Sequence, residues 1–297
     1  MNIRVKNALT VIVVMFLWAI CYPLITIGLE HAPHITFAAC RASIAGVILL
    51  LIGYSLGKPH PRGILLWLLL VLIGIGATTI GFYGMFHASE FLAPGIATVI
   101  TNLQPMLTAV LAYWFLSEKM SMRQFFAISM GFVGILIITS NNFPDNSNVS
   151  TTGIIYLLIA ITGLSVSNLL IKKITGQIDA LIAMGWQLIF GSVFLWLLAI
   201  STENQRDIDW TIEFIISLSG LSLLGTSLAY WLWFKALEQV DLVFANAFSF
   251  LAPAFGISIG ILFFNETFSM TTVIGLTVIF TGIVLINLPQ KGTNNAA

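Results

Sequence analysis

The residues of this chain that could do chemistry are few, and most of them lie inside long apolar runs. Arg41 is the charged side chain furthest inside such a run, about 9 Å along a helix that begins at Ile35. Its guanidinium group could receive the carboxylate of a small molecule, or it could extend outward and hold helix ends, with Glu30 or Glu213 as its partner. No run has an acid near its centre, so the sequence does not support a proton relay through a buried carboxylate.

Motifs for catalysis and metal binding are missing from the sequence. Cys21 and Cys40 both stand in apolar segments, where they are expected to be small core residues rather than a disulfide or redox pair. The patterns HExxH, paired CxxC and GxxxxGKS or GxxxxGKT do not occur, so we expect no metal, no cofactor and no enzymatic activity. An intramembrane enzyme remains as the alternative of another class. The histidines are all predicted in connections between the runs: His31, His34, His60 and His87.

Two prolines occupy matching places in two of the runs. Pro105 and Pro253 each stand near the middle of a run, where proline removes a backbone N–H and clashes with the carbonyl group four residues earlier. Those carbonyl groups belong to Thr101 and Ser249. Irregular backbone at membrane depth is tolerated where protein or a water-lined cavity satisfies it, so the pair predicts hinge or gating positions on a solute pathway. The alternative is that the prolines bend two helices so that they can pack.

Polar and aromatic side chains near these prolines are candidates for binding a small molecule. Asn102 and Asn246 are expected either to bond between helices or to contact the solute, since an amide in lipid needs a partner. Trp18 and Tyr22 stand past the inner membrane interface, whereas interfacial aromatic belts explain many other membrane Trp and Tyr residues. The predicted substrate-binding residues are Trp18, Tyr22, Tyr83, Thr101, Asn102, Gln104, Trp186, Gln187, Tyr230, Trp231, Asn246 and Ser249.

The composition indicates a membrane protein. Hydrophobic residues make up 58% of the 297 residues and charged residues 8%, whereas a soluble domain carries about 25% charged residues. The formal net charge is zero, which gives no indication of nucleic-acid binding. Apolar runs of about 20 residues cross a bilayer as helices. We predict ten such spans: 8–29, 35–54, 64–86, 93–116, 122–140, 152–171, 179–200, 212–234, 242–264 and 269–288.

Lysine and arginine predict the orientation of these spans. When the N-terminus is placed in the cytoplasm, the basic residues of the connections gather on the inner side, and the outer connections hold Arg206 alone. Both termini are therefore predicted to be cytoplasmic. The inner basic residues are Arg4, Lys6, Lys58, Arg62, Lys119, Arg123, Lys172, Lys173, Lys235 and Lys291.

One stretch of the chain recurs at an offset of 148 residues, since 86–122 realigns on 234–270 without a gap. Pairs that coincide at this offset include Tyr83 with Trp231, Pro105 with Pro253 and Glu118 with Glu266. Five spans per copy is an odd number, so the second copy must enter the membrane from the opposite side. The predicted fold class is therefore all-α integral membrane, with two inverted five-helix repeats at 1–143 and 144–297 in one compact membrane domain. Secondary transporters commonly have this plan, with their site between the halves.

Several sequence blocks carry a family resemblance: FLWAICYPL (16–24), AACRASIAGVILLL (38–51), LQPMLTAVLAYWFLSEKMS (103–121) and LAPAFGISIGILFFNETFS (251–269). With the duplicated five-span plan, they resemble the EamA-type members of the drug/metabolite transporter superfamily. The resemblance implies a transporter that exports amino acids, other metabolites or drugs. It also implies that an arginine at the place of Arg41 is usual whatever the substrate, which favours a structural role. The second half departs from the first at Gln187, which stands roughly where Arg41 stands.

We therefore expect a secondary transporter that moves a small metabolite, such as an amino acid or a similar amphiphilic solute, by alternating access and as an exporter. A drug exporter of the same family is the alternative. A scaffold would not need matched prolines, and a channel would show open-pore conductance. The expected location is a bacterial inner membrane, with several passes through it. The expected partners are the small-molecule substrate and the lipid bilayer, without nucleic acid; a homodimer stays open, with no direct support in the sequence.

Overall fold

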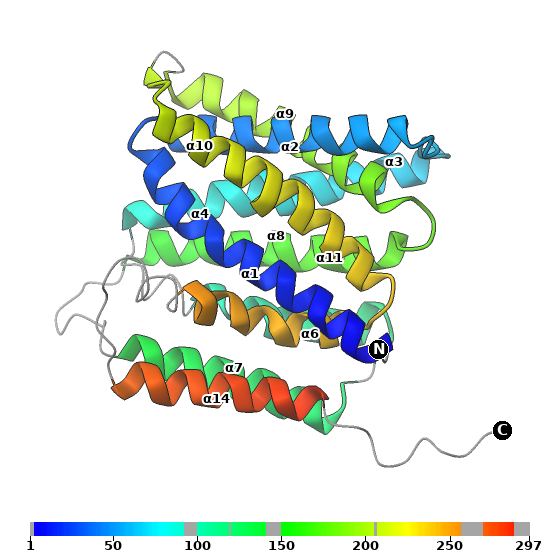
Figure 1. The fold of residues 1–297 in the computed structure, drawn as a ribbon, viewed down its shortest axis with the longest axis vertical. Helices are drawn as coiled ribbons and strands as arrows, with labels where there is room; N and C mark the ends of the chain where they lie inside the picture. Colours follow the sequence, from blue (N-terminus) through cyan, green and yellow to red (C-terminus); the bar gives the residue numbers. More distant parts are fainter. Residues whose placement is uncertain are drawn as a thin grey trace.

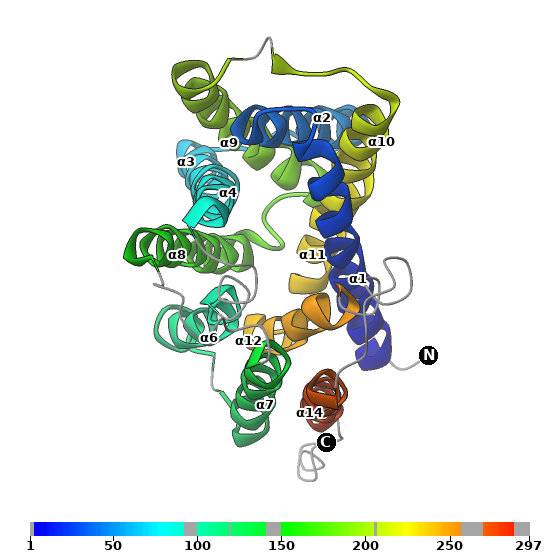
Figure 2. The same cartoon turned by 90° about the vertical axis from the view of Figure 1, so that its left-hand side faces the viewer.

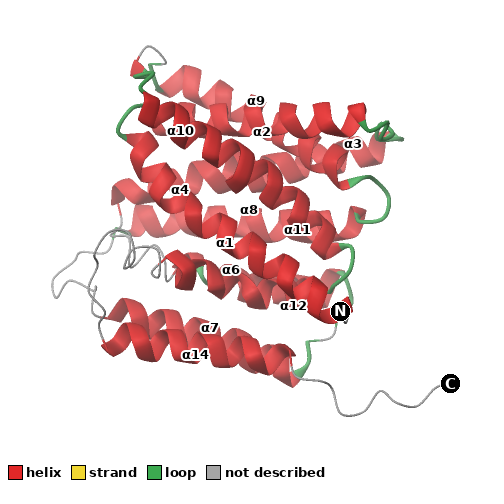
Figure 3. Ribbon diagram, viewed as in Figure 1, coloured by secondary structure: helices red, strands yellow, loops and turns green. Residues whose placement is uncertain are grey.

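The computed structural model describes residues 3–91, 100–118, 120–140, 150–204, 207–256 and 270–287. Within these ranges every regular element is a helix, which confirms the predicted all-helical class (Figure 1; Figure 3). The histidine prediction is wrong in part. His34 is the first residue of a helix and His87 lies inside another, because each helix extends beyond the apolar run that marks it in the sequence.

The first half of the chain forms helices in the order α1 Ile3–Leu29, α2 His34–Ser55, α3 Ile64–Ile73, η1 Gly74–Ile80, α4 Gly81–Phe91, α6 Gln104–Phe115 and α7 Met122–Thr139. The second half forms α8 Thr151–Ile174, α9 Ala180–Thr202, α10 Ile212–Gly220, η4 Leu221–Leu228, α11 Ala229–Leu237, α12 Leu242–Ala247, η5 Phe248–Phe250 and α14 Met270–Asn287. Segments η1 and η4 are π-helical, and η5 is a 3-10 helix.

Six continuous helical stretches are long and apolar enough to cross a membrane: Val5–Leu29, His34–Ser55, Ile64–Met85, Thr151–Ile174, Ala180–Thr202 and Ile212–Leu237. Shorter apolar helices lie at Met122–Ile138, Leu242–Gly256 and Met270–Leu285. The predicted spans 93–116, 242–264 and 269–288 include residues outside the described ranges. The count of ten spans therefore stays a prediction, whereas the apolar multi-helix character is observed.

The helices form two walls joined at both edges by a helix pair (Figure 2). Helix α2 packs along α9 at one edge, and α7 packs along α14 at the other. The first wall contains α3, η1, α4, α8 and α6, and the second contains α1, α10, η4, α11 and α12. Each wall therefore combines elements from both halves of the chain.

Glycines let some of these helices approach each other closely. A Cβ atom placed on Gly191 of α9 would lie 2.6 Å from the carbonyl oxygen of Gly74, the first residue of η1. At the other edge, a Cβ atom on Gly275 of α14 would lie 2.6 Å from the carbonyl oxygen of Gly134 of α7. Both contacts are with backbone atoms, which cannot rotate away, so these positions accept no side chain while the helices keep this spacing.

The carboxylate of Glu203, just after α9, caps the N-terminus of α2. It accepts hydrogen bonds from Ile35 N at 2.9 Å, Thr36 N at 2.7 Å and Thr36 Oγ1 at 2.7 Å. Pro33, which precedes α2, gives no side-chain cap of its own. An acceptor at a helix N-terminus satisfies N–H groups that have no partner within the helix, and its negative charge is favourable there.

Glu203→Ala should lower the free energy of unfolding by about 2 kcal/mol, because these N–H groups lose their acceptor. Glu203→Gln keeps an acceptor oxygen and should fall between the wild type and the alanine variant. The measurement is the thermal unfolding midpoint in detergent. Ser201→Ala is the matched control, since the exposed Ser201 hydroxyl bonds only within its own helix. Equal midpoints for Glu203→Ala and Ser201→Ala would contradict the capping role.

Candidate functional site

The two π-helical segments occupy matching places in the two halves. Adding the repeat offset of 148 residues moves η1, Gly74–Ile80, onto 222–228, which is η4 within one residue. A π-helical turn is rare and is found frequently at functional sites. Their recurrence at one place in both halves marks this level of the walls as the candidate site.

Side-chain hydrogen bonds lie within and next to the π segments. Around η1, Ser167 Oγ donates to the carbonyl of Ile73 at 3.2 Å, and Thr79 Oγ1 donates to the carbonyl of Gly191 at 3.0 Å. In η4, the hydroxyl of Ser227 donates to the carbonyl of Ser222 at 2.8 Å. Irregular backbone at membrane depth needs such partners. The π segments are therefore held in place by specific contacts.

Some polar atoms at the same level are buried without a hydrogen bond in the described part of the chain. They are Gln187 Nε2, Ser222 Oγ and Thr226 Oγ1. Gln187 is packed against η1 and accepts a hydrogen bond from Thr78 Oγ1 at 3.1 Å. Buried polar groups are normally satisfied, so each such group calls for a physical reason. A polar solute or water at this level would supply one.

Arg41 lies between the two walls at the level of the π segments. Its side chain is only 6% exposed, and its Cζ atom lies 4.2 Å from the centre of the Phe82 ring. Phe82 belongs to the first wall. On the other side, Ser227 of η4 donates to the carbonyl of Ala45, one turn of α2 after Arg41, at 3.3 Å, so α2 packs against the second wall here. Phe82 and Tyr230 coincide at the repeat offset, and each is the second residue after its π segment. The one deeply placed charge of the sequence therefore lies on Phe82, in the helix that also packs against η4.

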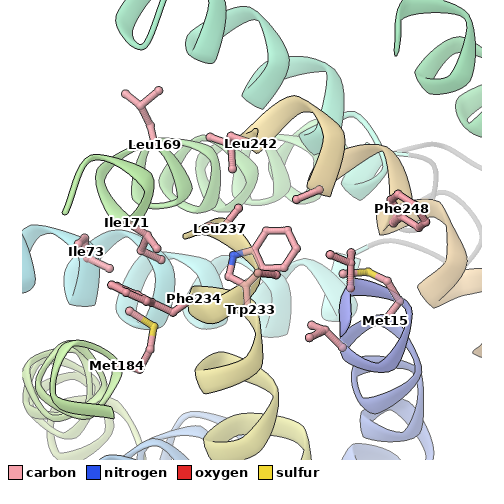
Figure 4. Packing of buried hydrophobic residues seen from close by; sticks show 14 of the residues in the cluster. Met15, Ile73, Leu169, Ile171, Met184, Trp233, Phe234, Leu237, Leu242 and Phe248 are labelled. Carbon is pink, nitrogen blue, oxygen red and sulfur yellow. The ribbon is translucent and has the colours of Figure 1, made fainter. Parts of the chain in front are cut away.

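Aromatic side chains continue this region along the second wall. Trp18 of α1 makes an edge-to-face contact with Tyr230, with ring centres 6.4 Å apart, and a tilted contact with Trp233 at 5.4 Å. Trp233 Nε1 donates to Asn168 Oδ1 of α8 at 3.0 Å and so reaches the first wall. Figure 4 shows Trp233 among buried hydrophobic side chains from α1, α8 and α9, including Met15, Ile171 and Met184.

Two aromatic candidates lie in other clusters. Trp186 packs on Trp67, with ring centres 4.9 Å apart, and donates from Nε1 to the hydroxyl of Tyr54 at 2.8 Å, so it ties α9 to α2 and α3. Tyr83 stacks on His87 at 4.2 Å within α4. Trp231 is half-buried. The structure thus brings Trp18 and Tyr230 together and places Trp186 and Tyr83 elsewhere; the side chain of Tyr22 lies outside what is described.

The polar candidates before the prolines are mostly bonded within the protein. Asn246 is 1% exposed and donates from its amide to the carbonyl of Leu242 in its own helix at 2.9 Å. Asn102 is buried. The carbonyl of Gln104 accepts a 3.5 Å hydrogen bond from Ser165 of α8, whereas Thr101 and Ser249 are half-buried. The amide of Asn246 is therefore occupied by backbone.

The matched prolines lie just after interruptions of their helices. Pro105 is the second residue of α6, and residues 102–103 before it form a turn. On the other side, η5 interrupts the run, and α-helix resumes at Leu251, two residues before Pro253. Proline is tolerated in the first turn of a helix, where its missing N–H would have no partner anyway. Each run therefore changes its hydrogen-bonding pattern just before its proline, while the backbone keeps right-handed helical dihedral angles.

Hydrogen bonds join the two walls at the end of the molecule that carries Lys58, Lys172, Lys173 and Lys235, here called the basic end. Glu118, after α6, accepts from Leu242 N at 3.0 Å and Val243 N at 3.2 Å, the first residues of α12. Lys172 of α8 donates from Nζ to the carbonyls of Leu237 at 2.7 Å and Val240 at 2.6 Å. These contacts therefore join the two walls at the basic end.

The sequence prediction missed Phe82, Trp233 and the π segments. Phe82 could have been found as the repeat partner of Tyr230, since both positions were available in the sequence. Trp233 is recognisable only through its contacts with Trp18 and Asn168. The π segments have no pattern in the sequence that we recognise.

Comparison with known proteins identifies the family of the chain. The model of the EamA-like transporter family matches residues 5–140 and again residues 151–288. The chain is 26% identical to "Uncharacterized transporter YvbV" of Bacillus subtilis, over 99% of this chain and 95% of that protein. It is 28% identical to "Protein PecM" of Dickeya dadantii, over 91% and 88% of the two chains. It is 23% identical to the "Probable amino-acid metabolite efflux pump" of Salmonella typhimurium, over 94% of each.

The fold is also similar to that of a protein solved by crystallography. The two superpose with a TM-score of 0.84, over 95% of this chain and 98% of that chain, at 16% sequence identity. At this identity the likeness concerns the fold alone.

Proposed function

Because the chain belongs to the EamA-like transporter family, we propose that it is a secondary transporter that moves a small metabolite across the membrane by alternating access. Its six long apolar helices and its family identify a multi-pass membrane protein, and its bacterial relatives indicate the inner membrane. The family consists of transporters rather than enzymes. The proposed repeats are 1–143 and 144–297, inverted with respect to each other.

The observation that carries the proposal is the pair of matched π segments beside Arg41. Both segments lie in the walls and both are followed two residues later by an aromatic residue, of which Phe82 contacts Arg41. Polar atoms without a hydrogen bond lie in η4 and beside η1. Transporters place their site near the midplane between repeats, at irregular helix segments. This arrangement supports a binding site shared by the two halves.

The contacts at the basic end support alternating access. By the positive-inside rule the basic end faces the cytoplasm, so Glu118 and Lys172 would close the inner side of the pathway. The helix interruptions at Pro105 and Pro253 would act as hinges when the inner side opens. In an exporter this inner opening admits the solute.

An amphiphilic amino acid or a related metabolite fits this site better than a cationic drug. The aromatic rings offer an apolar surface, and the relative from Salmonella typhimurium carries the name of an amino-acid metabolite efflux pump. A cationic drug would meet the buried charge of Arg41, and like charges at short range repel. The direction of transport is proposed as export.

The test of this function is counterflow in proteoliposomes. Vesicles loaded with unlabelled L-phenylalanine, L-threonine or L-cysteine should accumulate the same labelled amino acid transiently, and protein-free vesicles should not. Accumulation must saturate with concentration, because a channel would not show saturable counterflow. If cationic drugs alone gave counterflow, the transported class would be wrong; if no amino acid, organic acid or drug of a broad panel did, the transporter proposal would fail.

The topology gives a separate prediction. Cysteines placed at Ser147 and Thr202 should react with membrane-impermeant thiol reagents on intact cells, and a cysteine at Asn295 should react only after the membrane is opened. Ser147 and Asn295 lie outside the described residues, and Thr202 ends α9. The background for these variants replaces Cys21 and Cys40, the two native thiols. Equal labelling of Asn295 and Ser147 on intact cells would contradict the orientation.

A further inference from the structure

We propose that Arg41 binds the anionic group of the transported solute, so that the substrate is a small carboxylate-bearing molecule with an apolar body. This inference rests on the proposed function and names the substrate class for the same site. It starts from a conflict in the structure. Arg41 as a residue is only 6% exposed, and a buried charge should be paired, because an isolated one costs several kcal/mol.

Arg41 has no such partner among the described residues. Its Nε atom is buried without a hydrogen bond, and the ion pairs of the described chain join other residues. The two carboxylates that a structural role would use, Glu30 and Glu213, are both exposed at helix ends and make no ion pair with it. The deep burial of Arg41 also shows that its side chain does not extend to the surface of the protein.

The neighbours of Arg41 leave its donors available. Phe82 contacts the guanidinium group with a ring, which attracts a cation but accepts no conventional hydrogen bond. Guanidinium has five N–H donors in a planar fork that matches a carboxylate. Tyr230 lies on the other wall, two residues after η4, which packs against α2, and its ring contacts that of Trp18. A carboxylate on Arg41 with its apolar body against these rings would satisfy both parts of the site.

The position of Arg41 links this binding to the conformational cycle. Phe82 and Tyr230 stand on opposite walls, each directly after a π segment. An anion on Arg41 would therefore sit between the two walls, and it would supply the missing charge partner in every state that keeps Arg41 between them.

The test measures the charge of the site without relying on transport. In a background with Cys21→Ala and Cys40→Ala, Tyr230→Cys supplies one thiol beside Arg41. The purified protein is treated separately with two methanethiosulfonate reagents, one carrying an anionic sulfonate and one a cationic trimethylammonium group. The rate of modification by each reagent is divided by the rate at which the same reagent modifies a free thiol in solution. The anionic reagent should be favoured about tenfold. Arg41→Gln should remove this preference, whereas Arg41→Lys should keep most of it.

Protection identifies the carboxylate. Phenylacetate should slow modification of the thiol at Tyr230→Cys several-fold, and phenylacetamide, which has the same ring without the charge, should not. Arg41→Gln should abolish the protection. An elution profile unchanged from that of the parent protein would show that the variant is still folded. The inference is overturned if no reagent reaches the thiol, if the cationic reagent is equally fast, if the acid does not protect or if acid and amide protect equally.

These results separate the inference from the transporter proposal. A preference for anions that depends on Arg41, together with failed counterflow, would keep the anion site and reject transport. Counterflow with an uncharged or cationic solute, together with no preference for anions, would keep the transporter and reject the role of Arg41.

Discussion

Gly191→Ala is expected to disrupt the protein severely. The new Cβ atom would lie 2.4 Å from Thr78 Cβ and 2.6 Å from the carbonyl oxygen of Gly74, so α9 and η1 would have to separate. Forced overpacking of this kind costs about 1–3 kcal/mol or more, which corresponds to a fall of about 2–5 °C or more in the thermal midpoint of a chain of this length. Counterflow should be lost as well, because η1 carries the site. Thermal unfolding in detergent and counterflow in vesicles are the measurements.

Gly220→Ala is the matched control. A Cβ atom there would lie 3.0 Å from Leu24 Cδ1, the end of a side chain that can rotate. Alanine is favoured over glycine in a helix by about 1 kcal/mol, so this variant should be as stable as the wild type or slightly more stable. If Gly191→Ala were as stable as Gly220→Ala, the close approach of α9 to η1 would not constrain the fold.

Helical class and the places of backbone irregularity were predictable from the sequence. Apolar runs without charges can only form helices in a bilayer, and proline cannot stand inside a regular helix without cost. The structure accordingly interrupts the helices next to Pro105 and Pro253. The position of Arg41 well inside an apolar helix was also predictable, because it depends only on the distance of Arg41 from the start of α2.

The faces of the helices after the π segments were not predictable. The sequence analysis named the matched pair Tyr83 and Trp231, and also Tyr230, but it did not name Phe82, whose ring contacts Arg41. A π-helical turn holds more residues than an α-helical turn and so rotates everything that follows it. The face on which a residue after a π segment lies therefore does not follow from a regular period of 3.6 residues per turn.

Contacts between distant parts of the chain also escape sequence analysis. Glu203 caps a helix that begins almost 170 residues earlier, and Glu118 caps one that begins more than 120 residues later. In the sequence both are acidic residues near the end of an apolar run. Their role depends on which helix end packs beside them, which is a property of the fold.

Glu118→Ala is expected to open the basic end of the molecule. The N–H groups of Leu242 and Val243 would lose their acceptor, and Asp241, which precedes α12, makes no side-chain cap bond that could replace it. Hydrogen bonds to a charged group are worth about 1.5–3 kcal/mol each. A loss of about 2 kcal/mol that affects only the closed state would shift the equilibrium between closed and open by about thirtyfold.

The opening can be measured as a distance between two spin labels. Met120 and Gln239 are exposed and lie in the connections beside Glu118 and α12, so cysteines introduced there can carry the labels. In Glu118→Ala the population with a longer distance should grow, and counterflow should fall because the inner side no longer closes. Glu238→Ala removes one negative charge at the same end. The carboxylate of Glu238 pairs with Lys235, one helical turn away, at 2.9 Å, and this pair does not connect the two walls. That control should keep the wild-type distance; a similar change in both variants would show that charge at this end, rather than the bond between the walls, holds the pathway closed.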